Sequence, residues 1–317
     1  YVNDGPYDEL MLRSTTYLLG NSKENRLLPI LYIIDDASKW NDIDELKKSN
    51  PNMCVSVSED FFREEIAIAE NSLSKRGEFL TKYCNIKQNS TAAWLPYEVV
   101  DAVCGDNYRL EDFRSTYCVG GIDLSQTTDL TACCAVIEKD KKLYTFCQFF
   151  MPANKISELQ EREGVPYGIF VRNGWIKPSG ENFVNYEDCF EWFKMLVEEY
   201  EILPLQIGYD RYSSQYLVQE MTQYGFHMDD VFQGNNLTPV LHEADGLLRD
   251  KVLRLGDNNL LKAHFLNVAV QQDVENRKIR PVKIESRAHI DGFVAVIDAL
   301  TVRQKWYESI GEQLKNS

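Results

Sequence analysis

An acid inside an apolar hairpin constrains the fold of this chain more than any other feature. Residues 118–124 read Cys-Val-Gly-Gly-Ile-Asp-Leu, and after a short polar turn a second apolar run covers residues 131–137. This pattern predicts a strand that delivers Asp123 at its end, a turn, and a strand running back. An unpaired carboxylate out of water is costly, so Asp123 either caps the turn near Gln126 or meets a cation or donor.

Two later acids stand at similar junctions. Asp210 ends a short apolar segment that starts at Pro204, and Asp291 opens an apolar stretch that is predicted to be a helix. Ends of regular elements are where sheet proteins place their chemistry. Only tertiary folding could bring Asp123, Asp210 and Asp291 together, and three such carboxylates predict a divalent-metal site of oxygen ligands suited to Mg²⁺ or Mn²⁺.

Chain length predicts two domains, because 317 residues exceed the common single-domain size. A polar, linker-like region places the boundary between Asn85 and Thr116, which gives domains of residues 1–105 and 106–317. In the second domain, three meandering strands are followed by alternating helices and strands, so we expect an α/β fold with a mixed sheet. The expected helices include residues 259–273 and a long one that starts at Asp291.

Composition limits the environment of the chain. The eight cysteines form no C-x-x-C pair, which favours reduced, buried thiols over zinc or disulfides. No window approaches the roughly 20 apolar residues that span a bilayer. The chain begins at Tyr1 without a secretory start, so we expect a trimmed piece of a cytosolic protein.

Charge is unevenly distributed. The net charge of −15 argues against a protein that coats nucleic acid by bulk attraction. Residues 277–289, directly before Asp291, are nevertheless rich in Lys and Arg. Such a run is either a solvated face or a phosphate-binding segment, and its position beside a candidate metal acid keeps both interpretations open.

An apolar segment near the start ends on two acids. Residues 27–36 predict a buried strand that ends at Asp35 and Asp36, which resembles the second nucleotide-binding motif of P-loop ATPases. No G-x-x-x-x-G-K-[ST] loop precedes it, so we expect no ATPase activity from this chain alone. The alternative is that these acids cap a helix starting at Ile43.

The order of acids on a three-strand meander, a later strand and a late helix resembles the ribonuclease H-like nucleases. In detail the chain resembles the large terminase subunit of tailed bacteriophages, from the C-terminal part of its ATPase domain through its ribonuclease H-like nuclease domain. The stretches that carry the nuclease resemblance are Gly121-Ile122-Asp123-Leu124-Ser125, Asp129-Leu130-Thr131-Ala132, Tyr209-Asp210-Arg211 and Ile290-Asp291-Gly292, with Lys283, Ala295 and Ala299-Leu300.

This resemblance implies a function. It implies a metal-dependent endonuclease that cuts concatemeric viral DNA during packaging, with Asp123 between two Mg²⁺ or Mn²⁺ ions about 4 Å apart and Asp210 and Asp291 each holding one. The implied partners are double-stranded DNA, the portal protein and the small terminase subunit, in the host bacterial cytoplasm. ATP is implied only for the full-length parent.

Four further residues are secondary candidates. Asp298, two helical turns after Asp291, is either an outer metal ligand or a buried acid bonded to a neighbour. Arg211 either contacts phosphate or pairs with an acid, and Lys283 and Arg287 are candidates for DNA-backbone contact.

Two other functions remain open at this point. One is a different ribonuclease H-like nuclease, of the resolvase or transposase type. The other is a non-catalytic module that docks a motor on a portal or on DNA, in which the acids are purely structural. Divalent-metal binding separates this last alternative from the nucleases.

Overall fold

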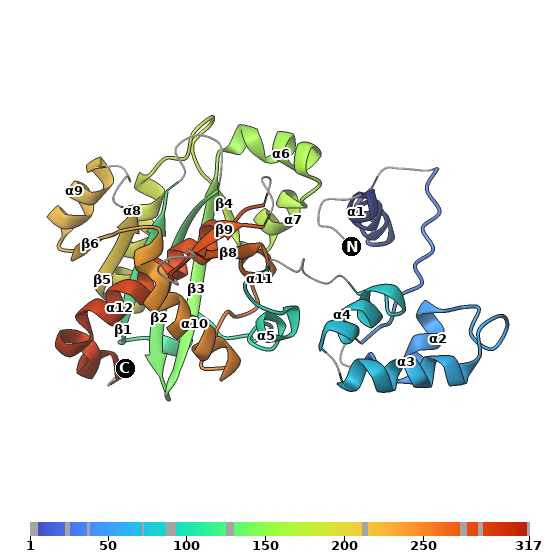
Figure 1. Ribbon diagram of the computed structural model, residues 1–317. Coiled ribbons are helices and arrows are strands. Elements are labelled where there is room, and N and C mark those ends of the chain that lie inside the picture. Colours follow the sequence, from blue (N-terminus) through green and yellow to red (C-terminus); the bar gives the residue numbers. More distant parts are fainter. Residues whose placement is uncertain are drawn as a thin grey trace. The chain divides into compact units, whose positions relative to one another are not determined.

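The computed structural model describes residues 6–22, 26–36, 39–71, 73–86, 93–124, 130–210, 215–272, 278–284 and 288–315. The chain divides into two compact units, Tyr1–Thr91 and Ala92–Ser317 (Figure 1). The division precedes residue 105 because residues 93–105 pair with the backbone of the second unit. The Trp94 N–H donates to the Val268 carbonyl at 2.8 Å, and the Leu255 N–H donates to the Val103 carbonyl at 2.9 Å.

The first unit is helical over its described residues. Its helices are α1 (Pro6–Leu18), α2 (Ile43–Ser49), α3 (Glu59–Asn71) and α4 (Leu73–Lys82). A small core forms where apolar side chains of α2, α3 and α4 meet, including Leu46, Phe62 and Phe79. Asp42 caps α2, since its side chain accepts a hydrogen bond from the Asp44 N–H. The cap is therefore not supplied by Asp35 or Asp36, the acids considered from the sequence.

The prediction of a strand over residues 27–36 is wrong. The structure assigns no strand to residues 26–36, and Leu28 and Ile30 are 84% and 64% exposed. A strand requires a neighbouring backbone to complete its hydrogen-bond ladder. Here the Tyr32 carbonyl accepts instead from a side-chain amide, that of Asn85, at 2.8 Å.

The second unit is built on a mixed sheet flanked by helices, which confirms the predicted fold class. Among the described residues, seven strands form this sheet in the order β4-β3-β2-β1-β5-β6, with β7 paired to β3. Strands β1, β2 and β3 form an antiparallel meander, whereas β5 and β6 run parallel to β1. The strands are β1 (Tyr117–Asp123), β2 (Thr131–Lys139), β3 (Lys142–Met151), β4 (Ile176–Pro178), β5 (Leu203–Asp210), β6 (Met228–Val231) and β7 (Leu253–Arg254).

Both faces of the sheet are covered. On β2, Ala132, Cys134 and Val136 belong to one apolar core, and the alternate residues Cys133, Ala135 and Ile137 belong to the other. This alternation explains why β2 is apolar along its length: a strand buried on both faces has no polar side. The helices α10 (Thr238–Arg249), α11 (Asn259–Leu266) and α12 (Asp291–Lys315) contribute to the first core, and α8 (Glu187–Tyr200) and α9 (Gln215–Tyr224) contribute to the second (Figure 1).

The remaining helices complete these layers. They are α5 (Tyr97–Asp101), α6 (Ile156–Glu163), α7 (Tyr167–Arg172), α8 (Glu187–Tyr200), α9 (Gln215–Tyr224), α10 (Thr238–Arg249), α11 (Asn259–Leu266) and α12 (Asp291–Lys315), with short 3₁₀ helices at Leu110–Phe113, Ala153–Lys155 and Asn235–Leu237. Within the described part of the chain, no helix has both the length and the apolar character needed to cross a membrane.

The helix predicted over residues 259–273 is wrong in its second half. Helix α11 ends at Leu266, and the chain continues as β8 (Val268–Gln272), antiparallel to β9 (Ile279–Lys283). The apolar run fits either a helix or a strand by periodicity, and the pairing of Val268 with Lys283 decides between them. The basic segment before Asp291 is therefore in part a β-strand.

Two glycines let α12 lie close against the sheet. Gly121 and Gly208 are register partners on the parallel strands β1 and β5. A Cβ atom at Gly121 would overlap the Ala295 carbonyl, and one at Gly208 would lie 2.5 Å from the Asp298 carbonyl oxygen. Only glycine permits this approach, which brings the first turns of α12 to the strands that carry Asp123 and Asp210.

Candidate active site

Asp123 and Asp210 lie at one edge of the sheet. Strands β1 and β5 are parallel neighbours, and the pairing of Ile122 with Tyr209 places the next residue of each strand, an aspartate, at the same carboxyl end. Both side chains are partly exposed there. The sheet edge therefore holds two carboxylates that are far apart in the sequence.

Helix α12 adds two more acids. Asp291 is its first residue and Asp298 lies two turns further on, with 8% and 0% of each residue exposed. Hydrogen bonding leaves one oxygen of each carboxylate, Oδ2, buried without a partner among the described residues. Such orphaned oxygens are costly and call for a ligand, a proton or an ion.

The four acids act on one another electrostatically. Burial raises the pKa of Asp123 well above its usual range, and the negative charges of Asp291, Asp298 and Asp210 raise it further. Lys283 opposes this rise. Because burial and like charge both disfavour ionisation, uptake of either a proton or a cation stabilises the site. Folding thus brings all three primary candidates into one electrostatic cluster.

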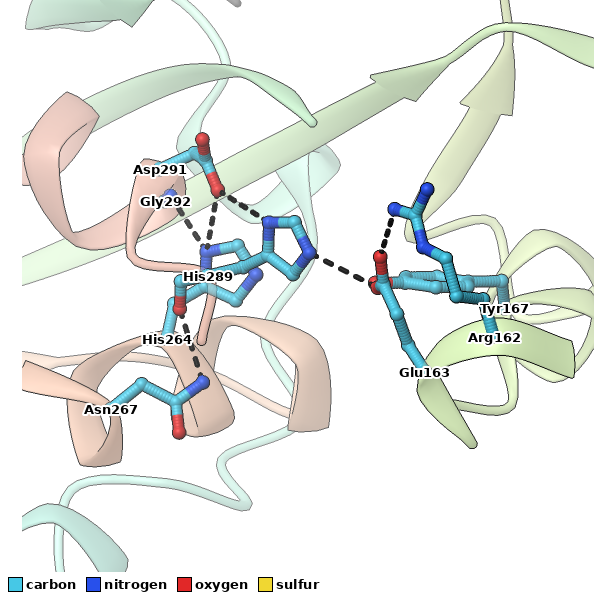
Figure 2. Close-up of polar contacts among 8 residues, drawn as sticks. All are labelled: Arg162, Glu163, Tyr167, His264, Asn267, His289, Asp291 and Gly292. Atoms are coloured by element: carbon cyan, nitrogen blue, oxygen red, sulfur yellow. Dashed lines mark hydrogen bonds and ion pairs between the residues drawn. The ribbon is translucent and has the colours of Figure 1, made fainter. Parts of the chain in front are cut away.

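Two histidines adjoin Asp291. His289 Nδ1 lies 3.6 Å and His264 Nδ1 lies 3.8 Å from Asp291 Oδ2, and the two rings are stacked (Figure 2). The Gly292 N–H donates to His264 Nδ1 at 2.9 Å, and burial lowers the pKa of His264 to about 3. His264 is therefore neutral, so the positive charge beside Asp291 comes from His289.

His289 lies between two carboxylates. Its Nε2 is 3.1 Å from Glu163 Oε2, while Nδ1 faces Asp291 (Figure 2). Burial disfavours the charged ring, but Asp291 and Glu163 outweigh it and raise the pKa of His289 to about 9. In turn, burial would raise the pKa of Asp291, but His289 lowers it below its usual value.

Glu163 has three donors. They are His289, the Tyr167 hydroxyl at 2.7 Å and the Arg162 guanidinium at 2.6 Å. Burial opposes ionisation of Glu163, yet these donors lower its pKa to about 2. Sequence reasoning missed Glu163, His264 and His289. The adjacency of His289 and Asp291 was a usable signal, whereas nothing in the sequence linked Glu163 to them.

Asp298 has a different environment. Gln233 Nε2 donates to its Oδ1 at 2.9 Å. Burial raises the pKa of Asp298 well above its usual value and Asp210 adds to the rise, while Gln233 opposes it. Of the two sequence interpretations of Asp298, the hydrogen bond matches the buried acid bonded to a neighbour; its role in ligation stays a prediction.

The basic candidates divide into two groups. Lys283 ends β9, is exposed, and acts electrostatically on Asp123. Arg211 and Arg287 lie outside the residues that the structure describes, as does Asp129.

The candidate ligand atoms are of the type that a hard divalent cation prefers. The site offers carboxylate oxygens at the carboxyl ends of β1 and β5 and on α12, and Mg²⁺ and Mn²⁺ prefer such ligands. Among the described residues, no hydrogen bond reaches the buried Oδ2 of Asp298. In the part of the chain that the structure describes, no three His, Cys, Asp or Glu side chains converge closely enough to hold a metal ion. The acids are thus gathered as an electrostatic cluster.

A mixed sheet with clustered acids at the carboxyl ends of β1 and β5 defines a ribonuclease H-like nuclease fold. Residues 29–305 match the family model described as terminase large subunit, endonuclease domain. The chain therefore belongs to the terminase large subunit endonuclease family, which confirms the resemblance found in the sequence.

Individual relatives agree with this family. The chain is 22% identical over 311 residues to protein YmfN of Escherichia coli K12, covering 95% of this chain and 68% of YmfN. It is 24% identical over 327 residues to the terminase large subunit of Enterobacteria phage HK97, covering 92% and 63%. The crystal structure of the HK97 large terminase matches the fold with a TM-score of 0.59 at 18% identity, over 92% of this chain and 60% of that one. The chain thus spans about two thirds of the length of these relatives.

Proposed function

We propose that this chain is a divalent-metal-dependent DNA endonuclease that cuts concatemeric viral DNA during genome packaging. The observation that carries the proposal is the electrostatic cluster at the sheet edge, where Asp123 lies in the field of Asp210, Asp291 and Asp298. Membership of the terminase endonuclease family supports the reaction class, hydrolysis of a DNA phosphodiester. The same membership favours a terminase over a resolvase or transposase.

Within this proposal, Asp123, Asp210 and Asp291 hold two Mg²⁺ or Mn²⁺ ions, with Asp298 as a further candidate. The chemistry supplied by bound ions is activation of the attacking water and neutralisation of charge on the leaving 3′ oxygen. The protein supplies a rigid edge of parallel strands for Asp123 and Asp210. Helix α12 supplies Asp291, whose ionised form His289 stabilises in advance of cation binding.

Substrate and partners follow from the same assignment. We propose that Lys283 contacts the phosphate backbone of double-stranded DNA, together with Arg211 and Arg287. Residues 1–105 are proposed to be the C-terminal part of an ATPase domain and its linker, of which residues 92–105 belong to the second compact unit. Coupling to ATP, the portal protein and the small terminase subunit is then a property of the full-length parent in the bacterial host.

Plasmid nicking tests the proposal. Supercoiled plasmid is incubated with Mg²⁺, Mn²⁺ or EDTA and either the wild-type chain or Asp123→Asn. We expect cleavage that requires metal and falls by about 100-fold or more in Asp123→Asn. Asp245→Asn is the matched control, because Asp245 is an aspartate on α10 that pairs with Arg249 away from the cluster. Equal inertness of wild type and Asp123→Asn, without Mn²⁺ binding by calorimetry, would instead favour a docking module.

A further inference from the structure

Glu163 occupies a position that local structure does not favour. It is the last residue of α6, where the helix dipole places partial negative charge, so a carboxylate there is disfavoured. Its side chain is only 8% exposed. The three donors from Arg162, Tyr167 and His289 compensate for both effects. The structure of α6 alone therefore does not explain a buried acid at its C-terminal end, and the explanation must come from residues outside α6.

That reason lies in the geometry of His289. His289 Nε2 lies 3.1 Å from Glu163 Oε2, and this contact orients the ring so that Nδ1 faces Asp291 Oδ2 at 3.6 Å. Figure 2 shows the imidazole bridging the two carboxylates. Without Glu163, the ring would lose the partner that fixes its orientation.

The backbone around Asp291 is clamped independently. Asn267 Nδ2 donates to the His289 carbonyl at 3.1 Å, and the Gly292 N–H donates to His264 at 2.9 Å (Figure 2). The second bond satisfies one of the N–H groups that lack a partner in the first turn of a helix. With the backbone held by these contacts, the imidazole of His289 is left to set the direction of the Asp291 carboxylate.

We propose that Glu163 is a positioning residue for the active site: acting through His289, it orients the Asp291 carboxylate for a divalent cation. Oδ2 of Asp291 is turned to the histidines, and the other carboxylate oxygen points away from them (Figure 2). Helix α6, inserted between β3 and β4, thereby becomes part of the machinery of a site formed by β1, β5 and α12. This inference rests on the proposed metal-dependent function.

Mn²⁺ titration by calorimetry of the full chain tests this inference. We expect Glu163→Gln to raise the Kd for Mn²⁺ about tenfold, as expected when a partner of a metal-ligating group is removed. Glu161→Gln is the matched control, since Glu161 is exposed on the same helix, and its Kd should stay at the wild-type value. Unfolding temperatures in EDTA, measured in parallel, separate a structural role from a positioning role, because a merely structural role lowers the unfolding temperature and leaves the Kd unchanged.

A double-mutant cycle tests whether Glu163 acts through His289. His289→Asn alone should raise the Kd, and adding Glu163→Gln to it should raise the Kd no further. Additive effects, or a wild-type Kd in Glu163→Gln, would overturn the inference. If Glu163→Gln does not fold, Tyr167→Phe removes a donor to the same carboxylate, and an unchanged Kd in that variant also counts against it.

The outcome also separates this inference from the proposed function. Mn²⁺ binding by wild type that is lost in Asp123→Asn, with no effect of Glu163→Gln, rejects the inference and leaves the nuclease proposal standing. Absence of Mn²⁺ binding by wild type rejects both.

Discussion

Two aspartates that lie two turns apart on α12, Asp291 and Asp298, have pKa values shifted in opposite directions. Asp291 and Asp298 are both buried aspartates on one helix. Burial disfavours ionisation of both, yet the pKa of Asp291 is lowered and that of Asp298 is raised well above its usual value. The difference lies in their neighbours, since a charged histidine adjoins Asp291 and a neutral amide adjoins Asp298.

Neighbouring groups, rather than burial, therefore decide which carboxylate is ionised before a cation binds. The histidine end of the site, formed by Asp291, His289 and His264, presents an ionised carboxylate. The amide end, formed by Asp298 and Gln233, holds an acid whose pKa is raised by burial and by Asp210. Burial and the charge of Asp210 thus disfavour the ionised form that a divalent ion needs there, which makes Asp291 the better ligand of the two.

The largest expected effect comes from neutralising the histidine end. Asp291→Asn should lower the metal-dependent nicking rate by about 100-fold or more, because the ionised carboxylate that meets the cation is lost. The rate is measured on supercoiled plasmid with Mg²⁺ and with Mn²⁺. Asp298→Asn, the same change on the same helix, is the comparison and should keep most of the activity. Equal losses in both variants would show that the two ends hold the cation alike.

A smaller effect of opposite sign is expected at the amide end. Asp298→Asn should raise the free energy of unfolding of the metal-free chain by about 1–3 kcal/mol at pH 7, because it removes an ionisable group whose charged form burial and Asp210 disfavour in the folded chain. The native pKa of Asp298 lies above the unfolded value. The contribution of Asp298 to wild-type stability is therefore fully present below about pH 4 and falls as pH rises toward the native pKa.

The gain from Asp298→Asn should therefore be small at pH 4 and should grow toward pH 7, by at most about 1.4 kcal/mol per pH unit. Urea unfolding in EDTA at several pH values measures it. A gain that is the same at pH 4 and pH 7 would mean that Asp298 titrates normally in the folded chain.

These contrasts mark how far the sequence could lead. The acids Asp123, Asp210 and Asp291 stand at ends of regular elements, and that pattern predicted a common site. The three-strand meander followed by alternating helices and strands predicted the mixed sheet. The opposite states of Asp291 and Asp298 could not be predicted, because they depend on His264, Gln233 and Glu163, which reach the site from other parts of the chain. The same holds for β8 and β9, whose strand character is decided by pairing rather than by local periodicity.

The smallest expected effect concerns Lys283, whose charge acts on the histidine end through His264. Its charge acts on Asp123 and His264, and its side chain is exposed at the end of β9. Lys283→Ala should weaken DNA binding at low salt and reduce the slope of log K against log salt concentration by about 1, as for one lost phosphate contact. Fluorescence anisotropy with a labelled duplex in EDTA measures this slope.

Lys194→Ala is the matched control, because Lys194 lies on α8, on the other face of the sheet, and pairs with Glu191. An unchanged slope in Lys283→Ala would mean that Lys283 interacts with the carboxylates of the site and does not contact DNA. In that case Lys283 would act by opposing the negative charge around Asp123, and removing it should tighten Mn²⁺ binding, since a positive charge beside a cation site disfavours the cation. The sign of the change in Mn²⁺ affinity therefore separates a lysine that contacts DNA only from one that tunes the histidine end.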